Sequence, residues 1–369
     1  MTAIHVKEGF IDFDNCLFLP KPVHDTIYKR CNPKPNDVLM VNIGAGVATT
    51  ALVNVDYEFS LKNVALLKPE KNILSGAFLN YCLSFRKPHT TAALLSGGAQ
   101  PFLSLKQIGD IEIPLPQSGE QRAIAAALSD VDSLISGQDQ LIAKKRDLKQ
   151  AAMQQLLTGK QRLPGFSGEW EVKRLGDVGV TYGGLTGKTK ADFDNGSAQY
   201  IPFLNVINNV VIDPNNLELV RVSAFEGQHQ AQKGDLFFNG SSETPEEVGM
   251  CSVLLEDFQN VYLNSFCFGF RLRKGVDAKG LYLAYFFRSG QGRILLYSLA
   301  QGATRYNLSK TNFLKLEIAL PEPDEQTAIA MVLSDMDAEI AALEQRRDKT
   351  RDLKQGMMQE LLTGRIRLV

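Results

Sequence analysis

Three short segments carry residue types that could bind a nucleotide or act on a base. Residues 183–189 read Gly-Gly-Leu-Thr-Gly-Lys-Thr, but a phosphate-binding loop needs glycine at 182, where Tyr182 stands. Residues 32–35, Asn-Pro-Lys-Pro, lack the aromatic residue on which an amino-methyltransferase stacks a flipped base, so we interpret them as a turn. Residues 44–46, Gly-Ala-Gly, lack the third glycine of a dinucleotide site. None of the three segments predicts a catalytic centre.

The residue spacing supports neither a metal site nor a hydrolytic centre. The five cysteines contain no Cys-x-x-Cys pair and the four histidines no His-x-x-x-His pair, so we expect free, mostly buried thiols and no metal. No Ser/His/Asp or Cys/His set stands out, and the tripeptide Glu-Val-Lys at 171–173 is too short to indicate a nuclease. We therefore predict that the chain is not an enzyme and that any catalysis lies in partner proteins.

Composition sets the broad class. The 369 residues carry 40 Lys+Arg against 41 Asp+Glu, a net charge of −1, with 44% hydrophobic and 22% charged residues, as in ordinary globular domains. No apolar run approaches the ~18–20 residues of a membrane span, and the N-terminus has no secretion signal. We expect a soluble, cytoplasmic chain. Its nearly neutral net charge does not by itself indicate a polyanionic partner.

The most informative feature of the sequence is an internal duplication. Residues 112–163 match residues 317–368 at a constant offset of 205, with 29 identities in 52 positions and no gap. Glu-Gln at 120–121 recurs at 325–326, and Arg-Asp-Leu-Lys-Gln at 146–150 recurs at 351–355. Chance does not produce such agreement, so the chain contains two copies of one structural unit.

Each copy predicts a short strand, a proline stop and one long helix. Apolar residues recur at steps of three and four, which is typical of a coiled-coil seam, although two separate amphipathic core helices remain the alternative. A polar stretch interrupts the seam in the middle of each copy. The predicted seam residues are Ile124, Leu128, Val131, Ile135, Leu148 and Leu156 in the first copy and Ile329, Leu333, Met336, Ile340, Leu353 and Leu361 in the second. A helix over 120–158 would be roughly 58 Å long at ~1.5 Å per residue, and an antiparallel pair would act as a spacer.

Strand-like segments and turns fill the sequence before each helix. Strand candidates are 38–41, 51–53, 61–67, 201–204, 235–238 and 266–272, and short helices are expected near 77–84 and 281–288. The two segments share this plan but hardly any sequence, which favours one frame that carries two specificities. The predicted fold is α+β: two globular α/β domains separated by two long antiparallel coiled-coil helices, with a pseudo-twofold repeat. We expect domains at 1–101, 102–163, 164–306 and 307–369.

The order of motifs resembles a known family. A variable domain is followed by Ile-x-Leu-Pro, Glu-Gln-x-Ala-Ile-Ala and Leu-Ser-Asp-x-Asp, and then by Arg-Asp-Leu-Lys-Gln and Leu-Leu-Thr-Gly, twice in one chain. This order is similar to that of the specificity subunit of type I restriction-modification systems, and residues 162–166 with Trp170 resemble the junction before its second target-recognition domain. The resemblance implies a non-catalytic subunit that binds double-stranded DNA, two adenine methyltransferase subunits and motor/endonuclease (restriction) subunits. It implies no cofactor in this chain, with S-adenosylmethionine, ATP and Mg²⁺ in the partners.

The first domain departs from this pattern. Subtracting 205 from Trp170 gives a position before Met1, so the first domain has no counterpart of roughly residues 170–202. We expect either an internal start codon, a truncated chain or an incomplete first domain, and each would put DNA reading by this domain in doubt.

Polar residues in turns between strands are the candidate DNA contacts, because base edges are read by paired donors and acceptors. For the first domain they are Lys62 and Gln100, and for the second Lys188, Asn239, Ser241, Ser242, Glu243, Thr304 and Arg305. Arg305 suits a guanine edge, and Lys188 suits a phosphate. Solvated loop residues are the alternative for each.

The functional prediction is a bipartite, asymmetric target with one half read by each domain. The main rival is a coiled-coil scaffold that joins proteins without reading DNA, and a self-contained nuclease or methyltransferase is a third possibility.

Overall fold

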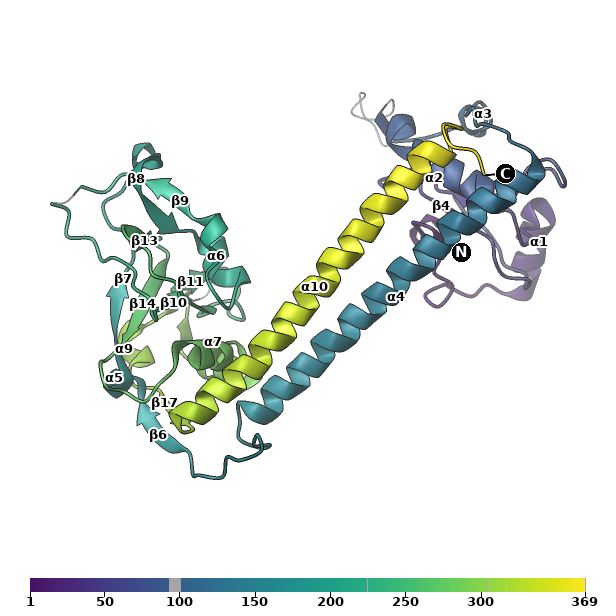
Figure 1. The fold of residues 1–369 in the computed structure, drawn as a ribbon. Coiled ribbons are helices and arrows are strands. Elements are labelled where there is room, and N and C mark those ends of the chain that lie inside the picture. Colours follow the sequence, from purple (N-terminus) through teal and green to yellow (C-terminus); the bar gives the residue numbers. More distant parts are fainter. Residues whose placement is uncertain (93–100, 224, 303, 369) are drawn as a thin grey trace. The chain divides into compact units, whose positions relative to one another are not determined.

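The computed structural model describes residues 1–92, 101–223, 225–302 and 304–368, and the chain divides into two compact units. Unit 1 comprises residues 1–140 and 343–369, and unit 2 comprises residues 141–342. Two helices of 39 residues each, α4 (Ser118–Leu156) and α10 (Pro323–Leu361), pass through both units (Figure 1). Each unit therefore contains one head of short strands and helices and a part of each long helix. The two predicted long helices are confirmed.

The head of unit 1 is built on a three-stranded antiparallel sheet. Its elements are β1 (Val6–Lys7), β2 (Phe10–Ile11), α1 (Lys21–Cys31), β3 (Val38–Met40), β4 (Thr50–Leu52), β5 (Ala65–Leu67), α2 (Gly76–Ala92) and α3 (Leu105–Gly109), with a 3₁₀ turn at Ala3–His5. The strand order is β4-β3-β5, so the central strand β3 pairs on both sides. Val38, Leu39 and Met40 are buried because the central strand has both faces covered.

The head of unit 2 is larger and contains a four-stranded sheet. The strands are β6 (Glu171–Arg174), β7 (Gly179–Gly183), β8 (Phe193–Ile201), β9 (Glu218–Val220), β10 (Leu236–Asn239), β11 (Ser241–Ser242), β12 (Cys251–Val253), β13 (Val261–Leu263), β14 (Cys267–Leu272), β15 (Ala300–Gln301), β16 (Tyr306–Leu308) and β17 (Glu317–Leu320). The helices are α5 (Leu175–Val178), α6 (Phe203–Asn208), α7 (Gly280–Arg288), α8 (Gly290–Tyr297) and α9 (Lys310–Phe313), with 3₁₀ turns at Lys190–Asp192 and Pro214–Asn216. The main sheet has the order β12-β10-β14-β7.

Aromatic side chains hold this larger head together. The Phe313 ring lies 4.9 Å from Phe238, 5.4 Å from Phe268 and 5.4 Å from Phe270, in edge-on arrangements that favour aromatic pairs. The same apolar cluster includes Leu156 of α4 and Leu333 of α10, so the head and the long helices of unit 2 share one core.

One strand prediction is wrong. Ile201 is the last residue of β8, and the residues that follow, Phe203–Asn208, form the helix α6 instead of a strand. Pro202 stands at the N-cap with φ −65°, and since proline has no backbone N–H it cannot continue a strand ladder on that side.

The two long helices pair antiparallel in each unit. In unit 1, Asp132 of α4 lies 2.6 Å from Lys354 of α10. In unit 2, Lys145 of α4 lies 2.6 Å from Glu339 of α10. The partners' numbers rise on one helix as they fall on the other, which confirms the antiparallel course. Within the described chain, none of the helices combines the length and apolar content that a bilayer span requires.

Most predicted seam residues are buried or half-buried, but two are not. Leu148 and Leu353 are 47% and 60% exposed, so their assignment to the seam was wrong. Leu148 follows Ile135 by 13 residues, about 3.6 turns, which places it on the opposite side of the helix. Ile142, seven residues after Ile135 and 2% exposed, takes the seam position instead. The buried seam residues are Ile124, Leu128, Leu156, Ile329, Leu333, Ile340 and Leu361, and the half-buried ones are Val131, Ile135 and Met336.

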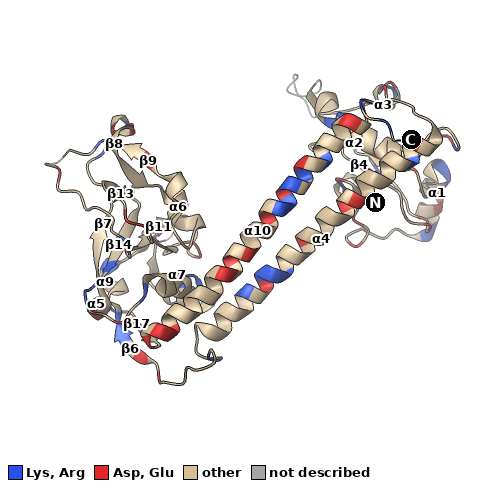
Figure 2. Ribbon diagram, viewed as in Figure 1, with Lys and Arg blue, Asp and Glu red and all other residues tan. Residues whose placement is uncertain are grey.

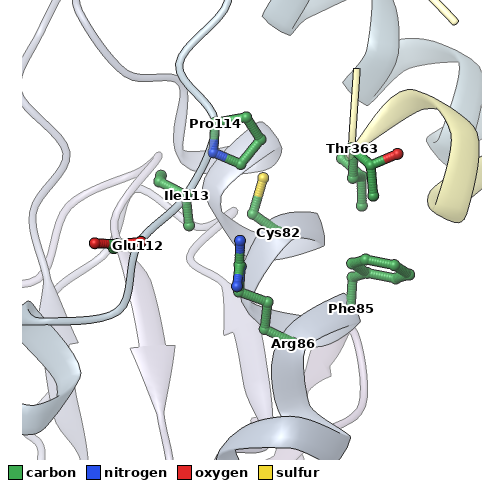
Figure 3. A pocket seen from close by; sticks show the side chains of 8 residues that line it. Cys82, Phe85, Arg86, Glu112, Ile113, Pro114 and Thr363 are labelled. Atoms are coloured by element: carbon green, nitrogen blue, oxygen red, sulfur yellow. The ribbon is translucent and has the colours of Figure 1, made fainter. Parts of the chain in front are cut away.

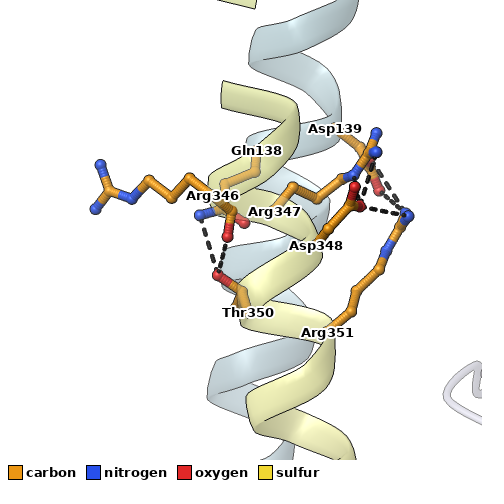
Figure 4. Close-up of polar contacts among 7 residues, drawn as sticks. All are labelled: Gln138, Asp139, Arg346, Arg347, Asp348, Thr350 and Arg351. Carbon is orange, nitrogen blue, oxygen red and sulfur yellow. Dashed lines mark hydrogen bonds and ion pairs between the residues drawn. The ribbon is translucent and has the colours of Figure 1, made fainter. Parts of the chain in front are cut away.

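The polar interruption of the seam is visible as a set of side-chain contacts in unit 1 (Figure 4). Gln138 and Thr350 are buried against each other, with Nε2 3.4 Å from Oγ1. Beside them, Asp139 of α4 accepts hydrogen bonds from Arg347 and Arg351 of α10 at 3.4 and 3.0 Å. A buried polar pair in a helical seam stabilises less than apolar residues but favours one register, because a shifted helix would leave both groups unpaired.

Candidate nucleic-acid interface and its frame

The second aspartate of each Leu-Ser-Asp-x-Asp motif joins a head to both long helices. In unit 2, Asp337 of α10 accepts a hydrogen bond from the Tyr285 hydroxyl of α7 at 2.8 Å. Asp337 also forms an ion pair with Lys149 of α4. The Lys149 ammonium also lies 5.5 Å from the Tyr285 ring centroid, a cation–π distance. Burial and the Asp337 carboxylate raise the pKa of Tyr285, so the phenol stays protonated as the donor.

The same three groups meet in unit 1. Asp132 of α4 accepts from the Tyr81 hydroxyl of α2 at 2.8 Å and lies 2.6 Å from the Lys354 ammonium of α10, which is 5.5 Å from the ring centroid of Tyr81. The offsets between the units are 205 for the aspartates and lysines and 204 for the tyrosines. The aspartate and lysine were visible as repeated motifs, whereas the tyrosines were missed, because they lie in heads that hardly resemble each other in sequence.

The repeated Glu-Gln dipeptide provides a second joint. In unit 1, Gln121 donates to the Ile73 carbonyl at 2.8 Å and accepts from the Ser75 N–H at 2.8 Å, just before α2 begins. In unit 2, Gln326 donates to the Asp277 carbonyl at 2.9 Å and accepts from the Lys279 N–H at 2.8 Å, just before α7 begins.

Both glutamines are buried, with exposures of 1% and 0%. Loss of either would leave backbone groups without partners, which costs more than one hydrogen bond contributes. The repeated motifs thus build a frame that holds each head.

Two loops that are far apart in the sequence meet in the head of unit 2. β11 pairs antiparallel with β16, which places Ser241 opposite Asn307 and Ser242 opposite Tyr306. This pairing brings together the predicted sites in 241–243 and 304–305. Glu243, Thr304 and Arg305 are exposed and Ser241 is partly exposed, so the four residues form a polar surface, which we call the β11–β16 face.

An aromatic residue that sequence analysis missed lies on this face. Phe266 is 54% exposed, and the guanidinium carbon of Arg305 lies 5.7 Å from its ring centroid. An exposed aromatic ring beside an arginine can hold the guanidinium in place while its N–H groups stay available to an acceptor. In the sequence, Phe266 was the first residue of the strand candidate 266–272, and an aromatic residue at that place does not by itself indicate a binding site.

Two predicted contact residues are part of the framework instead. Asn239 is 0% exposed and accepts from the Met250 N–H at 2.5 Å, and Ser242 is 7% exposed and donates to Glu247 at 3.0 Å. The structure therefore contradicts their assignment as base contacts, because neither side chain is accessible. They shape the loop that carries Glu243.

Lys188 is also held by contacts within the head of unit 2. Its side chain is 7% exposed, pairs with Glu226 and donates to the Arg221 carbonyl at 2.5 Å. This pairing lowers the pKa of Glu226 to about 2 and leaves Lys188 without a free charge for a phosphate, so that assignment is corrected as well. Lys62 in unit 1 is exposed, and Gln100 lies outside the described residues.

Two half-buried arginines hold loops in the head of unit 2. Arg288 donates to the carbonyls of Val206, Ile207 and Asn209 at 2.8, 2.7 and 2.7 Å. Arg293 donates to the Glu246 and Val248 carbonyls at 2.6 Å each. Desolvation lowers the pKa of both guanidinium groups, but an arginine keeps its charge across the physiological range. Each is a fixed cation that pins loop carbonyls in place.

The described residues contain no cluster of three or more His, Cys, Asp or Glu side chains that could hold a metal ion. Both α4 and α10 contain basic and acidic residues along their length (Figure 2), so neither helix carries charge of one sign alone. Such a mixed surface favours contact with protein over contact with a polyanion.

The family follows from a comparison with known proteins. A model of the type I restriction modification DNA specificity domain matches residues 23–144 and 167–350, which is well over half of the chain, with one match for each head. The chain belongs to this family. It is a DNA sequence-recognition subunit and not an enzyme, as expected from the sequence.

Individual relatives agree. The specificity subunit of the type I restriction enzyme EcoKI from Escherichia coli K12 is 23% identical over 343 residues, which cover 89% of this chain and 73% of the relative. A putative specificity subunit, MjaX, from Methanocaldococcus jannaschii is 24% identical over 358 residues, which cover 90% of this chain and 79% of the relative.

Solved structures show the same fold. A chain of a type I R-M system studied for its assembly and conformational transition matches with a TM-score of 0.59 at 18% identity, over 89% of this chain and 82% of that one. The type I S subunit from M. genitalium matches with a TM-score of 0.57 at 14% identity, over 90% and 84%. Specificity subunits work in complexes with methyltransferase and restriction subunits on DNA, and the cofactors of these complexes belong to the partner subunits.

Proposed function

We propose that each head of this specificity subunit reads one half of a bipartite, asymmetric DNA target. The observation that carries the proposal is the contrast within the molecule: the Tyr-Asp-Lys contact recurs in both units, whereas the loops on the heads differ. In the specificity family, unlike heads on one repeated frame are what a target with two unlike halves requires.

The residues proposed to contact DNA in unit 2 are those of the β11–β16 face. Arg305 is the proposed guanine reader, because its guanidinium can donate two parallel hydrogen bonds to a guanine edge. Ser241, Glu243 and Thr304 are the proposed neighbouring contacts. Lys62 is the proposed contact in unit 1. With a net charge of −1, the chain should bind DNA weakly when alone and more tightly inside a complex whose partners supply positive charge.

The proposed role of the frame is to carry the catalytic subunits. Two adenine methyltransferase subunits would dock on α4 and α10, and each would flip and methylate one adenine in its half of the target. Restriction subunits would join this complex, with S-adenosylmethionine, ATP and Mg²⁺ bound by the partners. We place this activity in the cytoplasm, where the host DNA is.

Methylome sequencing of cells that express this chain with its methyltransferase tests the proposal. The expected result is one methylated motif with two unlike halves and a fixed gap. A continuous palindromic motif would contradict the proposal. Absence of sequence-dependent DNA binding with the methyltransferase present would instead favour a protein scaffold without a reading role.

A further inference from the structure

The frame of unit 1 contains a cleft whose counterpart in unit 2 is filled. A cavity of about 350 Å³ lies between the segment before α4 and the end of α10, and Leu115, Glu120, Ile124, Leu361, Gly364 and Arg367 line it. We call this the strand cleft. A second cavity, of about 340 Å³, lies beside the same segment, between residues 112–114 and Cys82 and Arg86 of α2 (Figure 3). The segment 112–115 is therefore loosely packed on two sides.

Trp170 fills the corresponding place in unit 2. Gly159 and Gly364 are counterparts in the repeat, and both have a positive φ, 69° and 74°. A Cβ on Gly159 would lie 3.3 Å from the Trp170 ring, whereas a Cβ on Gly364 would meet no atom within 4 Å. The counterpart of Arg367, Arg162, has its guanidinium carbon 5.7 Å from the Trp170 ring centroid. Two repeated residues thus contact an aromatic ring in one unit and border a cavity in the other.

The covered and uncovered surfaces differ in exposure as this predicts. Leu320 of β17, which pairs with β6, is 2% exposed, whereas its counterpart Leu115 is 57% exposed. The ion pair of Arg162 with Glu325 has side-chain exposures of 25% and 0%, and the pair of Arg367 with Glu120 has 63% and 9%. An exposed leucine at a site that is buried in the sister unit indicates a contact surface.

The backbone of 112–115 is also suited to a partner strand. In unit 2, β17 pairs antiparallel with β6, and the Leu175 N–H donates to the Leu316 carbonyl at 2.8 Å. Hydrogen-bonded pairs alternate along such a ladder, so Ile318 and Leu320 point their backbone groups at β6 while Ala319 points away. Pro114 replaces Ala319 in unit 1, at a position where the missing N–H removes no ladder bond.

Unit 1 leaves the matching groups available. In the part of the chain that the structure describes, the backbone N–H groups of Ile113 and Leu115 donate no hydrogen bond, and no strand pairs with 112–115. Exposed N–H and C=O groups in an extended segment are a template for an added strand.

The match ends beyond β6. In unit 2 the Tyr182 ring of β7 lies against Gly269, where an added Cβ would approach the ring to 2.1 Å. Leu66 occupies the same register position in unit 1, opposite Leu39 as Gly269 is opposite Phe237. A tyrosine could not lie there in the same way, so the match with unit 2 includes β6 and its tryptophan but not β7.

We propose that the strand cleft of unit 1 binds an extended segment of another polypeptide that presents Gly-x-Trp followed by a short strand, as residues 168–174 do in unit 2. The tryptophan ring would lie on Gly364 beside Arg367, and the strand would pair antiparallel with Ile113 and Leu115. This is strand addition to an open edge, with an aromatic residue as the anchor that sets the register.

The test uses the full-length chain and a synthetic, end-capped peptide with the sequence of residues 167–175 that carries 5-fluorotryptophan. Fluorine NMR should show saturable binding, and hydrogen exchange should slow at Ile113 and Leu115 by at least tenfold. A peptide with alanine in place of tryptophan should not bind. Gly364→Asn, which tolerates the positive φ and fills the cleft, should weaken binding at least tenfold. Gly9→Asn, also at a positive φ in open space in unit 1, is the matched control and should leave binding unchanged.

Failure to saturate up to millimolar peptide would overturn the proposal. Equal binding of the alanine peptide would do so as well, because the anchor would then be irrelevant. So would protection of β17 in place of 112–115, since the peptide would then have displaced β6 in unit 2. Gly364 is exposed, so the Gly364→Asn variant is expected to fold, which far-ultraviolet circular dichroism verifies.

Discussion

In unit 2 the ion pair between Arg162 and Glu325 lies under Trp170, whereas in unit 1 the corresponding pair of Arg367 and Glu120 faces solvent. The two units nevertheless make the same Tyr-Asp-Lys contact and the same glutamine bridge. The frame contacts therefore do not depend on how the outer surface is covered, because each is made between elements inside its own unit.

The cores of the two units differ in a second way. In unit 2 one apolar cluster runs from Phe238 of the sheet to Leu333 of α10. In unit 1 the sheet residue Val38 belongs to one cluster, and Leu128 of α4 belongs to another with Phe78 of α2. The head of unit 2 should consequently unfold together with its helices, while the sheet of unit 1 can open more independently.

The largest expected effect comes from a charge placed in each core. Leu128→Arg and Leu333→Arg each bury an unpaired cation at a site that is 0% exposed, which should cost more than about 3 kcal/mol. Urea denaturation followed by circular dichroism measures the loss. Leu333→Arg should unfold head and helices of unit 2 together, and Leu128→Arg should leave exchange protection in β3 of unit 1. Equal loss of protection in both heads would refute the difference between the cores.

Arg305→Ala tests whether the heads read separate halves. Loss of a bidentate contact should reduce discrimination at one base by about 1–3 kcal/mol, roughly fivefold to 150-fold, in only one half of the target. Lys62→Ala should act on the other half and weaken binding without changing base preference. Methylation assays on a library of target variants measure both. If Arg305→Ala altered both halves, independent reading would be excluded.

Matched changes at the joint should have matched, smaller effects. Asp132→Asn and Asp337→Asn each weaken the hydrogen bond to a tyrosine and remove the ion pair to a lysine. Because the aspartate side chains are 42% and 37% exposed, solvent screening should hold the cost to about 1 kcal/mol in each unit. Thermal unfolding of both variants measures it. A much larger cost in one unit would show that the repeated joint is used unequally.

Alkaline pH should weaken both joints in the same range. Burial raises the pKa of Tyr81 and of Tyr285 above the ordinary value of about 10. The stabilisation they provide is complete below pH ~10 and is lost as the pH rises toward their folded-state pKa, because the unfolded chain then releases protons more readily. Unfolding free energies of Tyr81→Phe and Tyr285→Phe should fall less steeply above pH 10 than those of the parent. An unchanged slope would contradict a buried phenol in the joint.

The smallest effect is expected at the two leucines that the seam excludes. Leu148→Ser and Leu353→Ser should each change stability by less than about 0.5 kcal/mol, since both side chains are exposed. Ile142→Ser, at the position that replaced Leu148 in the seam, is the matched comparison and should cost several times more. Denaturation midpoints distinguish the two outcomes, and equal costs would restore the original seam.

Contacts between residues of the internal repeat could be predicted from the sequence. The repeat of residues 112–163 predicted two long helices, their antiparallel pairing and the family. This was possible because the same apolar periodicity and the same motifs form the same frame contacts in both units. The candidate site was predicted less completely. Arg305 and Thr304 are exposed and stay candidate DNA contacts. Asn239 and Ser242 are not candidates because they are buried, and Lys188 is not a candidate because it pairs with Glu226. Burial of a short polar residue depends on which loops fold over it, and loops carry no periodic signal.

The sequence by itself determined the two-copy architecture, the helical frame and the absence of a recognisable catalytic motif, since these follow from periodicity, spacing and residue type. Tertiary structure decided which residues meet. It joined Asp337 to Tyr285 across unrelated segments, brought Ser241 next to Asn307, and left Leu115 exposed where Leu320 is covered. Each of these depends on distances between residues far apart in the chain, which only packing fixes.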